Sequence, residues 1–172
     1  MTAVHMIAPD RRRHAEPIFV SGSLSIRQLP QAVKARLGKI VDDGVPVLVG
    51  DARGVDTAVQ LYLSDWNVDA VTVFCTGSTP RNNIGGWPVT RVKSDARPGT
   101  REWHSAKDRE MSLPAGAGLV IWDGTRKGSG FNIRRLSDRG CPVIIYLHPA
   151  GRFVQLSTDA ERNAFFSRYL PG

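Results

Sequence analysis

The sequence PVLVGDARGVDT, residues 46–57, joins a short apolar run to a glycine-bearing turn. The run at 47–49 has the length and composition of a buried parallel strand. Over 55–66, apolar residues recur at intervals of three and four, which is typical of a helix packed on a sheet. The turn contains Gly50 and Gly54, and it leads into a helix N-terminus whose free N–H groups suit an anionic or polar ligand. The stretch predicts a strand, a binding turn and a helix, although the same glycines would also serve a turn that is only tightly packed.

The composition is that of an ordinary globular domain. The chain has 172 residues, of which 41% are hydrophobic and 23% charged, enough for one domain with a real core. Its apolar runs are too short to span a membrane, and the stretch after the arginines at 11–13 is broken by Ser21 and Gly22, so we predict a cytoplasmic protein. The net charge of +7 suits nucleic acid or nucleotide phosphates as partners, and equally a solvated basic surface.

Strand and helix patterns alternate along the chain. The expected strands lie at 18–20, 47–49, 71–74, 89–92, 119–122, 142–147 and 152–155. The expected helices lie at 29–40, 55–66, 101–113 and 131–136, with a last helix opened by a capping box at 158–161. This order predicts a single-domain α/β fold, a doubly wound, Rossmann-like parallel sheet with helices on both faces. Residues 1–17 form a basic lead-in, and 18–172 form the domain.

Several chemistries lack their sequence signatures. No lysine lies in a P-loop frame, no G-x-G-x-x-G fingerprint is present, and neither serine at 21 or 23 lies in a G-x-S-x-G elbow. The histidines have no ligand spacing with Cys75 or Cys141, so we predict no metal site and two buried, reduced thiols. His104 is expected to be a surface or packing residue and not a base.

The large aromatic residues divide into two groups. Tyr62 and Trp66 continue the apolar stripe of the 55–66 helix and are predicted core residues, and Trp122 ends a buried strand beneath the site. Trp87 lies in the irregular stretch 76–100. It would either stack on a ligand base or plug this loop onto the sheet, and the plug is favoured.

Four motifs resemble the SLOG superfamily, which groups the Smf/DprA DNA-uptake proteins with the LOG-type "lysine decarboxylase-like" proteins. GDARGVDTA at 50–58 is similar to its G-x-A-x-G-x-D turn, and FVSGS at 19–23 to its first strand and turn. KDREM at 107–111 resembles its Arg/Met-bearing helix, and GLVIWDGTRKGSGFNI at 118–133 its second phosphate-side loop. The resemblance covers 19–147, leaves 148–172 as a C-terminal extension, and fits a small stand-alone member. It implies a Rossmann-like fold that binds a nucleotide-type ligand where the strand order reverses, and by analogy a dimer.

The predicted site lies at the carboxyl edge of the sheet. Backbone amides and Ser129 would hold a phosphate, and Asp56 or Asp123 would accept hydrogen bonds from ribose hydroxyls. The strands at 47–49 and 119–122 are expected to be near neighbours, so that Gly54 and the 128–130 loop form one anion-binding floor. The predicted binding residues are Ser21, Gly22, Ser23, Gly50, Asp51, Arg53, Gly54, Asp56, Arg109, Asp123, Gly124, Gly128, Ser129 and Gly130.

The chain departs from the LOG-type phosphoribohydrolases at one decisive position. Their P-G-G-x-G-T-x-x-E loop carries a catalytic glutamate, which falls here on Ile133 or Arg134, and their threonine falls on Phe131. Arg109, Asp56 and Asp123 remain as catalytic candidates. The sequence therefore favours a sensor or binding protein for a nucleotide or nucleotide-derived small molecule, with no other cofactor. An N-glycosidic-bond hydrolase is the alternative, and a DprA-like binder of single-stranded DNA is the third possibility.

Overall fold

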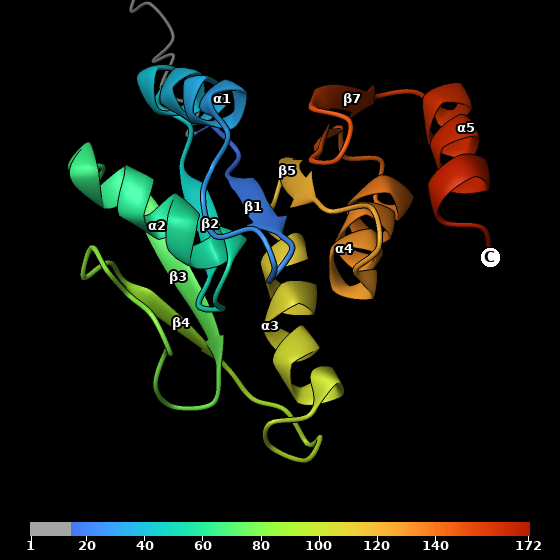
Figure 1. Ribbon diagram of the computed structural model, residues 1–172. Helices are drawn as coiled ribbons and strands as arrows, with labels where there is room; N and C mark the ends of the chain where they lie inside the picture. The colour runs from blue at the N-terminus through green and yellow to red at the C-terminus, as the bar shows by residue number, and fades with distance from the viewer. Residues whose placement is uncertain (1–14) are drawn as a thin grey trace, which may run out of the picture.

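The computed structural model describes residues 15–172, and within them one sheet is covered by helices on both faces (Figure 1). Most of the predicted lead-in at 1–17 lies outside the described residues. The sheet has seven strands in the order β4-β3-β2-β1-β5-β6-β7, all parallel except β7, which runs antiparallel to β6. The strands are β1 (Ile18–Gly22), β2 (Val47–Gly50), β3 (Val71–Thr76), β4 (Val89–Val92), β5 (Ala117–Trp122), β6 (Val143–Leu147) and β7 (Arg152–Leu156). The predicted single-domain, Rossmann-like α/β fold is confirmed.

Alternating strand residues feed two hydrophobic layers. On β1, Ile18 and Val20 belong to the layer under the first two helices, whereas Phe19 belongs to the layer on the other face. Both faces are apolar because both are covered, as expected for parallel strands. α1 (Gln31–Asp42) and α2 (Val55–Asp65) cover one face, and α3 (Arg101–Ser112), α4 (Lys127–Asp138) and α5 (Asp159–Tyr169) cover the other (Figure 1).

The strand order reverses between β1 and β5. The chain moves outward from β1 through β2 and β3 to β4, then returns to place β5 on the other side of β1. β1 therefore separates the runs at 47–49 and 119–122, with Val20 paired to both Val49 and Leu119. The two runs share one sheet edge without being direct neighbours. In open α/β sheets a reversal of this kind opens a crevice at the carboxyl ends of the strands.

Three aromatic predictions have different outcomes. Trp87 is buried and its Nε1 donates to the Val68 carbonyl at 2.7 Å, so it is the predicted plug. Trp122 is also buried, with its Nε1 donating to the Arg126 carbonyl at 3.0 Å. Trp66 is 68% exposed, and its prediction as a core residue was wrong. Trp66 is the C-cap of α2, and its ring lies beside that of Tyr62, with 6.2 Å between the two ring centroids, at the end of the helix and not in the core.

α4 begins earlier than the sequence predicts. The glycine-rich stretch after β5 was expected to be a loop up to position 130, but α4 begins at Lys127, so Gly128 and Gly130 lie in its first turn.

Cys75 and Cys141 are both buried free thiols. Among residues 15–172, no helix is long and apolar enough to cross a membrane.

Candidate functional site

A pocket of about 890 Å³ opens at the carboxyl edge of the sheet, where the strand order reverses. Its walls come from the turns after β1, β2 and β3, from α3, and from the first turns of α4. Among the described residues that line it, seven are lysine or arginine and three are aspartate or glutamate. The pocket is therefore cationic, and its size is that of a cleft for a small molecule.

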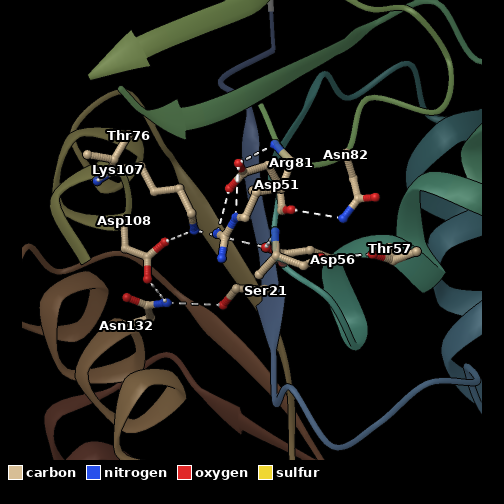
Figure 2. Close-up of polar contacts among 12 residues, drawn as sticks. Ser21, Asp51, Asp56, Thr57, Thr76, Arg81, Asn82, Lys107, Asp108 and Asn132 are labelled. Carbon is tan, nitrogen blue, oxygen red and sulfur yellow. Dashed lines mark hydrogen bonds and ion pairs between the residues drawn. The ribbon is translucent and has the colours of Figure 1, made fainter. Parts of the chain in front are cut away.

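A buried ion cluster forms the floor of the pocket (Figure 2). Lys107 Nζ lies 2.7 Å from Asp108 Oδ1 and 4.0 Å from Asp56 Oδ2. The side chains of Lys107 and Asp56 are only 6% and 8% exposed. The Asp56 carboxylate also accepts a hydrogen bond from the Ala52 amide at 3.1 Å, which fixes it at the start of α2.

Burial sets the protonation of this cluster. It raises the pKa of Asp56 to about 6, because the nearby Lys107 ammonium offsets only part of the desolvation and Asp108 adds repulsion. Burial alone would lower the pKa of Lys107, but the carboxylates of Asp108 and Asp56 outweigh it and raise that pKa above the usual value. Lys107 is therefore a cation paired with Asp108, and Asp56 titrates at about pH 6.

A hydrogen-bonded chain continues from this cluster across the pocket. Asn132 Nδ2 lies 3.4 Å from Asp108 Oδ2 and 3.4 Å from Ser21 Oγ (Figure 2). Arg135 Nη1 donates to Asn132 Oδ1 at 2.7 Å. This series of hydrogen bonds connects α3, α4 and the end of β1. These contacts hold the three elements that face each other across the crevice.

A second ion pair holds the loop after β3. Arg81 binds Asp51 at two points, Nη2 to Oδ1 at 2.8 Å and Nε to Oδ2 at 3.2 Å, and its amide donates to Oδ2 at 2.8 Å (Figure 2). Burial would raise the pKa of Asp51, but the hydrogen bonds and charge of Arg81, with a contribution from Lys107, lower it. Asp51 is therefore ionised and holds Arg81 in the pocket wall.

The loop before α4 is organised by Asp123. Its Oδ1 accepts hydrogen bonds from the amides of Thr125 and Arg126, both at 2.9 Å, and its Oδ2 from the Ser25 hydroxyl at 2.8 Å. Burial opposes ionisation, but these hydrogen bonds prevail and lower the pKa of Asp123 to about 2. The carboxylate is occupied by the loop, and the loop in turn directs the α4 N-terminus at the pocket.

The structure brings half of the predicted binding residues to the pocket. Those that line it are Ser21, Gly22, Ser23, Asp56, Arg109, Gly128 and Ser129. Those outside the lining of the described structure are Gly50, Asp51, Arg53, Gly54, Asp123, Gly124 and Gly130.

Three of the glycines outside the lining have packing roles. A Cβ at Gly54, where φ is +76°, would meet the Leu24 carbonyl at 2.5 Å, so this glycine serves a turn packed on the β1 loop. A Cβ at Gly130 would lie 2.8 Å from a methyl of Leu170, on the side of the C-terminal segment. At Gly50 a Cβ would lie 2.7 Å from Lys107 Nζ, so Gly50 makes room for the ion cluster. Of the expected anion-binding surface, made of Gly54 and residues 128–130, only Gly128 and Ser129 in the first turn of α4 line the pocket.

Sequence reasoning missed much of the lining. Lys107 and Asp108 belong to the KDREM motif and Phe131 and Asn132 to the 118–133 motif, but none of the four is among the predicted binding residues, and all four line the pocket. A lysine in a polar helix segment is ordinarily solvated, so nothing in its spacing indicated burial. His104 also lines the pocket, with its pKa lowered by burial and by the charges of Arg81 and Lys107.

Comparison with known proteins finds a similar fold but no similar sequence. No protein-family model matches the chain. No curated protein matches it either. The structure is similar to that of DNA processing protein A from Helicobacter pylori, which was described for its single-stranded DNA binding mode. The two share 15% sequence identity with a TM-score of 0.57, over 89% of this chain and 73% of that chain. At this identity the likeness establishes a DprA-like, Rossmann-type fold.

Proposed function

We propose that this protein binds a nucleotide or nucleotide-derived small molecule in the pocket at the carboxyl edge of its sheet, as a ligand sensor or binding protein. The observation that carries the proposal is the position of the pocket. It opens where the strand order reverses, between the turn after β1 and the first turn of α4. In folds of this type the crevice at such a reversal is the ligand site.

The chemistry of the lining supports a phosphate-bearing ligand. The first turn of α4 contributes Lys127, Gly128 and Ser129, and helix N–H groups at such a terminus favour an anion. Arg101, Arg109 and Arg126 add positive charge to the lining. Asp56 and Asp108 supply carboxylates that can accept hydrogen bonds from sugar hydroxyls.

Membership of the SLOG superfamily and a dimeric state belong to the same proposal. The motifs at 19–23, 50–58, 107–111 and 118–133, together with the DprA-like fold, support the membership. The dimer rests on analogy alone. Light scattering over a wide concentration range tests it, and a monomer throughout would reject it.

Hydrolysis of an N-glycosidic bond is the second candidate, and Asp56 favours it. The motif glutamate of the LOG-type enzymes is absent at 133 and 134, but Asp56 places a carboxyl group of raised pKa, about 6, in the pocket lining. A group with such a pKa can donate or accept a proton near neutral pH. Asp123, by contrast, is engaged by its own loop and lies outside the lining.

Binding of single-stranded DNA is the third candidate. It is favoured by the DprA-like fold and by the excess of cations in the pocket. Phosphate contacts release counterions, so affinity for an oligonucleotide would fall steeply with salt concentration. A shallow salt dependence would count against this candidate.

The deciding experiment is calorimetric titration of the purified protein with AMP, GMP, CMP and UMP, followed by chromatography for free base. Saturable binding without release of base supports the binding protein, and released base identifies the hydrolase. Lys127→Glu reverses a charge in the lining and is expected to weaken binding. Lys34→Glu makes the same change at an exposed position of α1, away from the pocket, and is the matched control. Absence of binding for all four nucleotides would reject the proposal.

A further inference from the structure

Phe131 is a large apolar side chain at the surface of a cationic pocket. It lies on α4, lines the pocket and is 47% exposed. Its helix neighbours Asn132 and Ile133 are buried, so Phe131 lies on the face of α4 that is left open. Single exposed apolar residues are common on protein surfaces, so exposure alone carries no meaning.

Two guanidinium groups flank this ring. Arg101, from the first turn of α3, has its Cζ 5.2 Å from the centroid of the Phe131 ring, and Arg135, one turn further along α4, has its Cζ at 6.0 Å. Both arginines also line the pocket. Arg135 is held by its 2.7 Å hydrogen bond to Asn132 Oδ1, which belongs to the polar chain across the crevice. A half-exposed aromatic ring is thus combined with two guanidinium groups, which supply both planes for stacking and positive charge for a phosphate.

This combination matches a nucleobase attached to a phosphate. Bases stack on aromatic side chains and on arginine planes, and the cations hold the backbone or terminal phosphate. A sugar phosphate without a base would use only the cations. The exposed apolar surface beside those cations therefore distinguishes the two classes of ligand.

We infer that Phe131, flanked by Arg101 and Arg135, is the platform on which the base of a base-bearing phosphate stacks. The inference rests on the proposed function and names the part of the ligand that this pocket selects. The same chemistry occurs in a free nucleotide and in a nucleotide of a single strand, so the test carries an arm for each source. Stacking of this kind tolerates any of the bases.

The test compares AMP, ribose 5-phosphate and an oligothymidylate on three variants by calorimetry. Phe131→Leu keeps an apolar side chain and removes the aromatic face, whereas Phe131→Trp keeps the face. We expect Phe131→Leu to weaken AMP binding by about fivefold to a hundredfold and to leave ribose 5-phosphate unchanged, because the lost stacking concerns only the base. Phe131→Trp retains AMP binding. Trp66→Leu removes another exposed aromatic ring, outside the pocket, and is expected to change nothing.

The outcomes separate this inference from the proposed function. If AMP and ribose 5-phosphate bind equally well to the wild-type protein and to Phe131→Leu, the stacking platform is wrong and the small-molecule site stands. Equal losses for both ligands would also overturn the platform, since Phe131 would then only support the shape of the pocket. If oligothymidylate binds, AMP does not, and Phe131→Leu weakens the strand, the platform stands and the small-molecule function falls. Failure of all three probes to bind the wild-type protein overturns both.

Discussion

Asp56 Oδ2 lies 4.0 Å from Lys107 Nζ at the floor of the pocket, where both side chains are almost completely excluded from solvent. Asp108 makes the shorter contact to the same ammonium group, at 2.7 Å. The charge of Lys107 is therefore balanced inside the protein and is not free for a ligand. The cations that remain available to a phosphate are those of the wall and rim, such as Arg101, Arg109 and Lys127.

Replacing Lys107 should destabilise the protein strongly. Lys107→Met keeps most of the length of the side chain but leaves two carboxylates of the floor without their cation, and we expect a loss of about 3 kcal/mol in the free energy of unfolding at pH 7. Urea denaturation measures this loss. Lys39→Met is the matched control, because Lys39 pairs with Asp43 at 3.2 Å on the exposed face of α1, where such a pair contributes about 0.5 kcal/mol or less. Similar losses for the two variants would contradict the buried cluster.

The raised pKa of Asp56 should make the free energy of unfolding depend on pH. Its pKa is raised from 3.8 to about 6 in the folded state, so its contribution is fully present below pH 3.8 and is lost as the pH rises through about 6. The shift corresponds to about 3 kcal/mol. The measurement is the free energy of unfolding of the wild-type protein minus that of Asp56→Asn, from pH 4.5 to 7.5, and we expect this difference to fall with pH.

The pKa of Asp123 is shifted in the opposite direction, so its contribution to stability depends on pH in the opposite way and in a different pH range. Its pKa is lowered to about 2, so its contribution is present above pH 3.8 and is lost only as the pH falls through about 2. Titration of Asp123 therefore lies outside the range chosen for Asp56. A difference between wild type and Asp56→Asn that stays constant or rises from pH 4.5 to 7.5 would disprove the raised pKa.

The ion pair between Asp51 and Arg81 gives a third prediction. The Asp51 side chain is 3% exposed and depends on Arg81 for two side-chain hydrogen bonds. Arg81→Met removes both, and we expect it to cost about 2 kcal/mol, because hydrogen bonds to charged groups contribute roughly 1.5–3 kcal/mol. Arg91→Met, which removes one exposed hydrogen bond to the Ser78 carbonyl, is the control and should cost less. Equal stability of both variants in thermal unfolding would show that Asp51 does not need its partner.

The fold could be predicted because the strands are buried on both faces. Runs such as 47–49 and 119–122 are apolar at every position, and the alternation of such runs with amphipathic segments specifies a parallel sheet. The position of β1 between these two runs has no local signature, since strand order depends on tertiary packing. Trp66 shows the same limit at a helix end, because the apolar stripe of α2 does not reveal how far the core extends along the helix.

The site could be predicted only at the level of its turns. The residues at the end of β1 and those at the start of α4 could be predicted because glycine and serine mark turns. Lys107, Asp108 and Arg81 were missed because they reach the pocket from a helix and a long loop whose positions depend on the whole fold. Gly128 and Gly130 could not be distinguished without the start of α4. Two residues of a helix differ by about 200° around its axis, so one glycine lines the pocket and the other contacts the C-terminal segment.

The two glycines of α4 give the last prediction, which opposes binding to stability. An added Cβ at Gly128 enters open space within the described structure, whereas one at Gly130 approaches a methyl of Leu170 to 2.8 Å. We expect Gly128→Asp to fold as well as the wild type or slightly better, because a carboxylate in a first helical turn contributes about 0.5 kcal/mol. The same charge would occupy the proposed phosphate position and lower AMP affinity about tenfold or more by repulsion. Gly130→Ala should instead leave AMP binding unchanged and change stability little, because the Leu170 methyl can shift and alanine favours a helix over glycine. Calorimetry and urea denaturation on both variants measure the two effects, and a loss of AMP affinity in Gly130→Ala with none in Gly128→Asp would place the anion on the other side of α4.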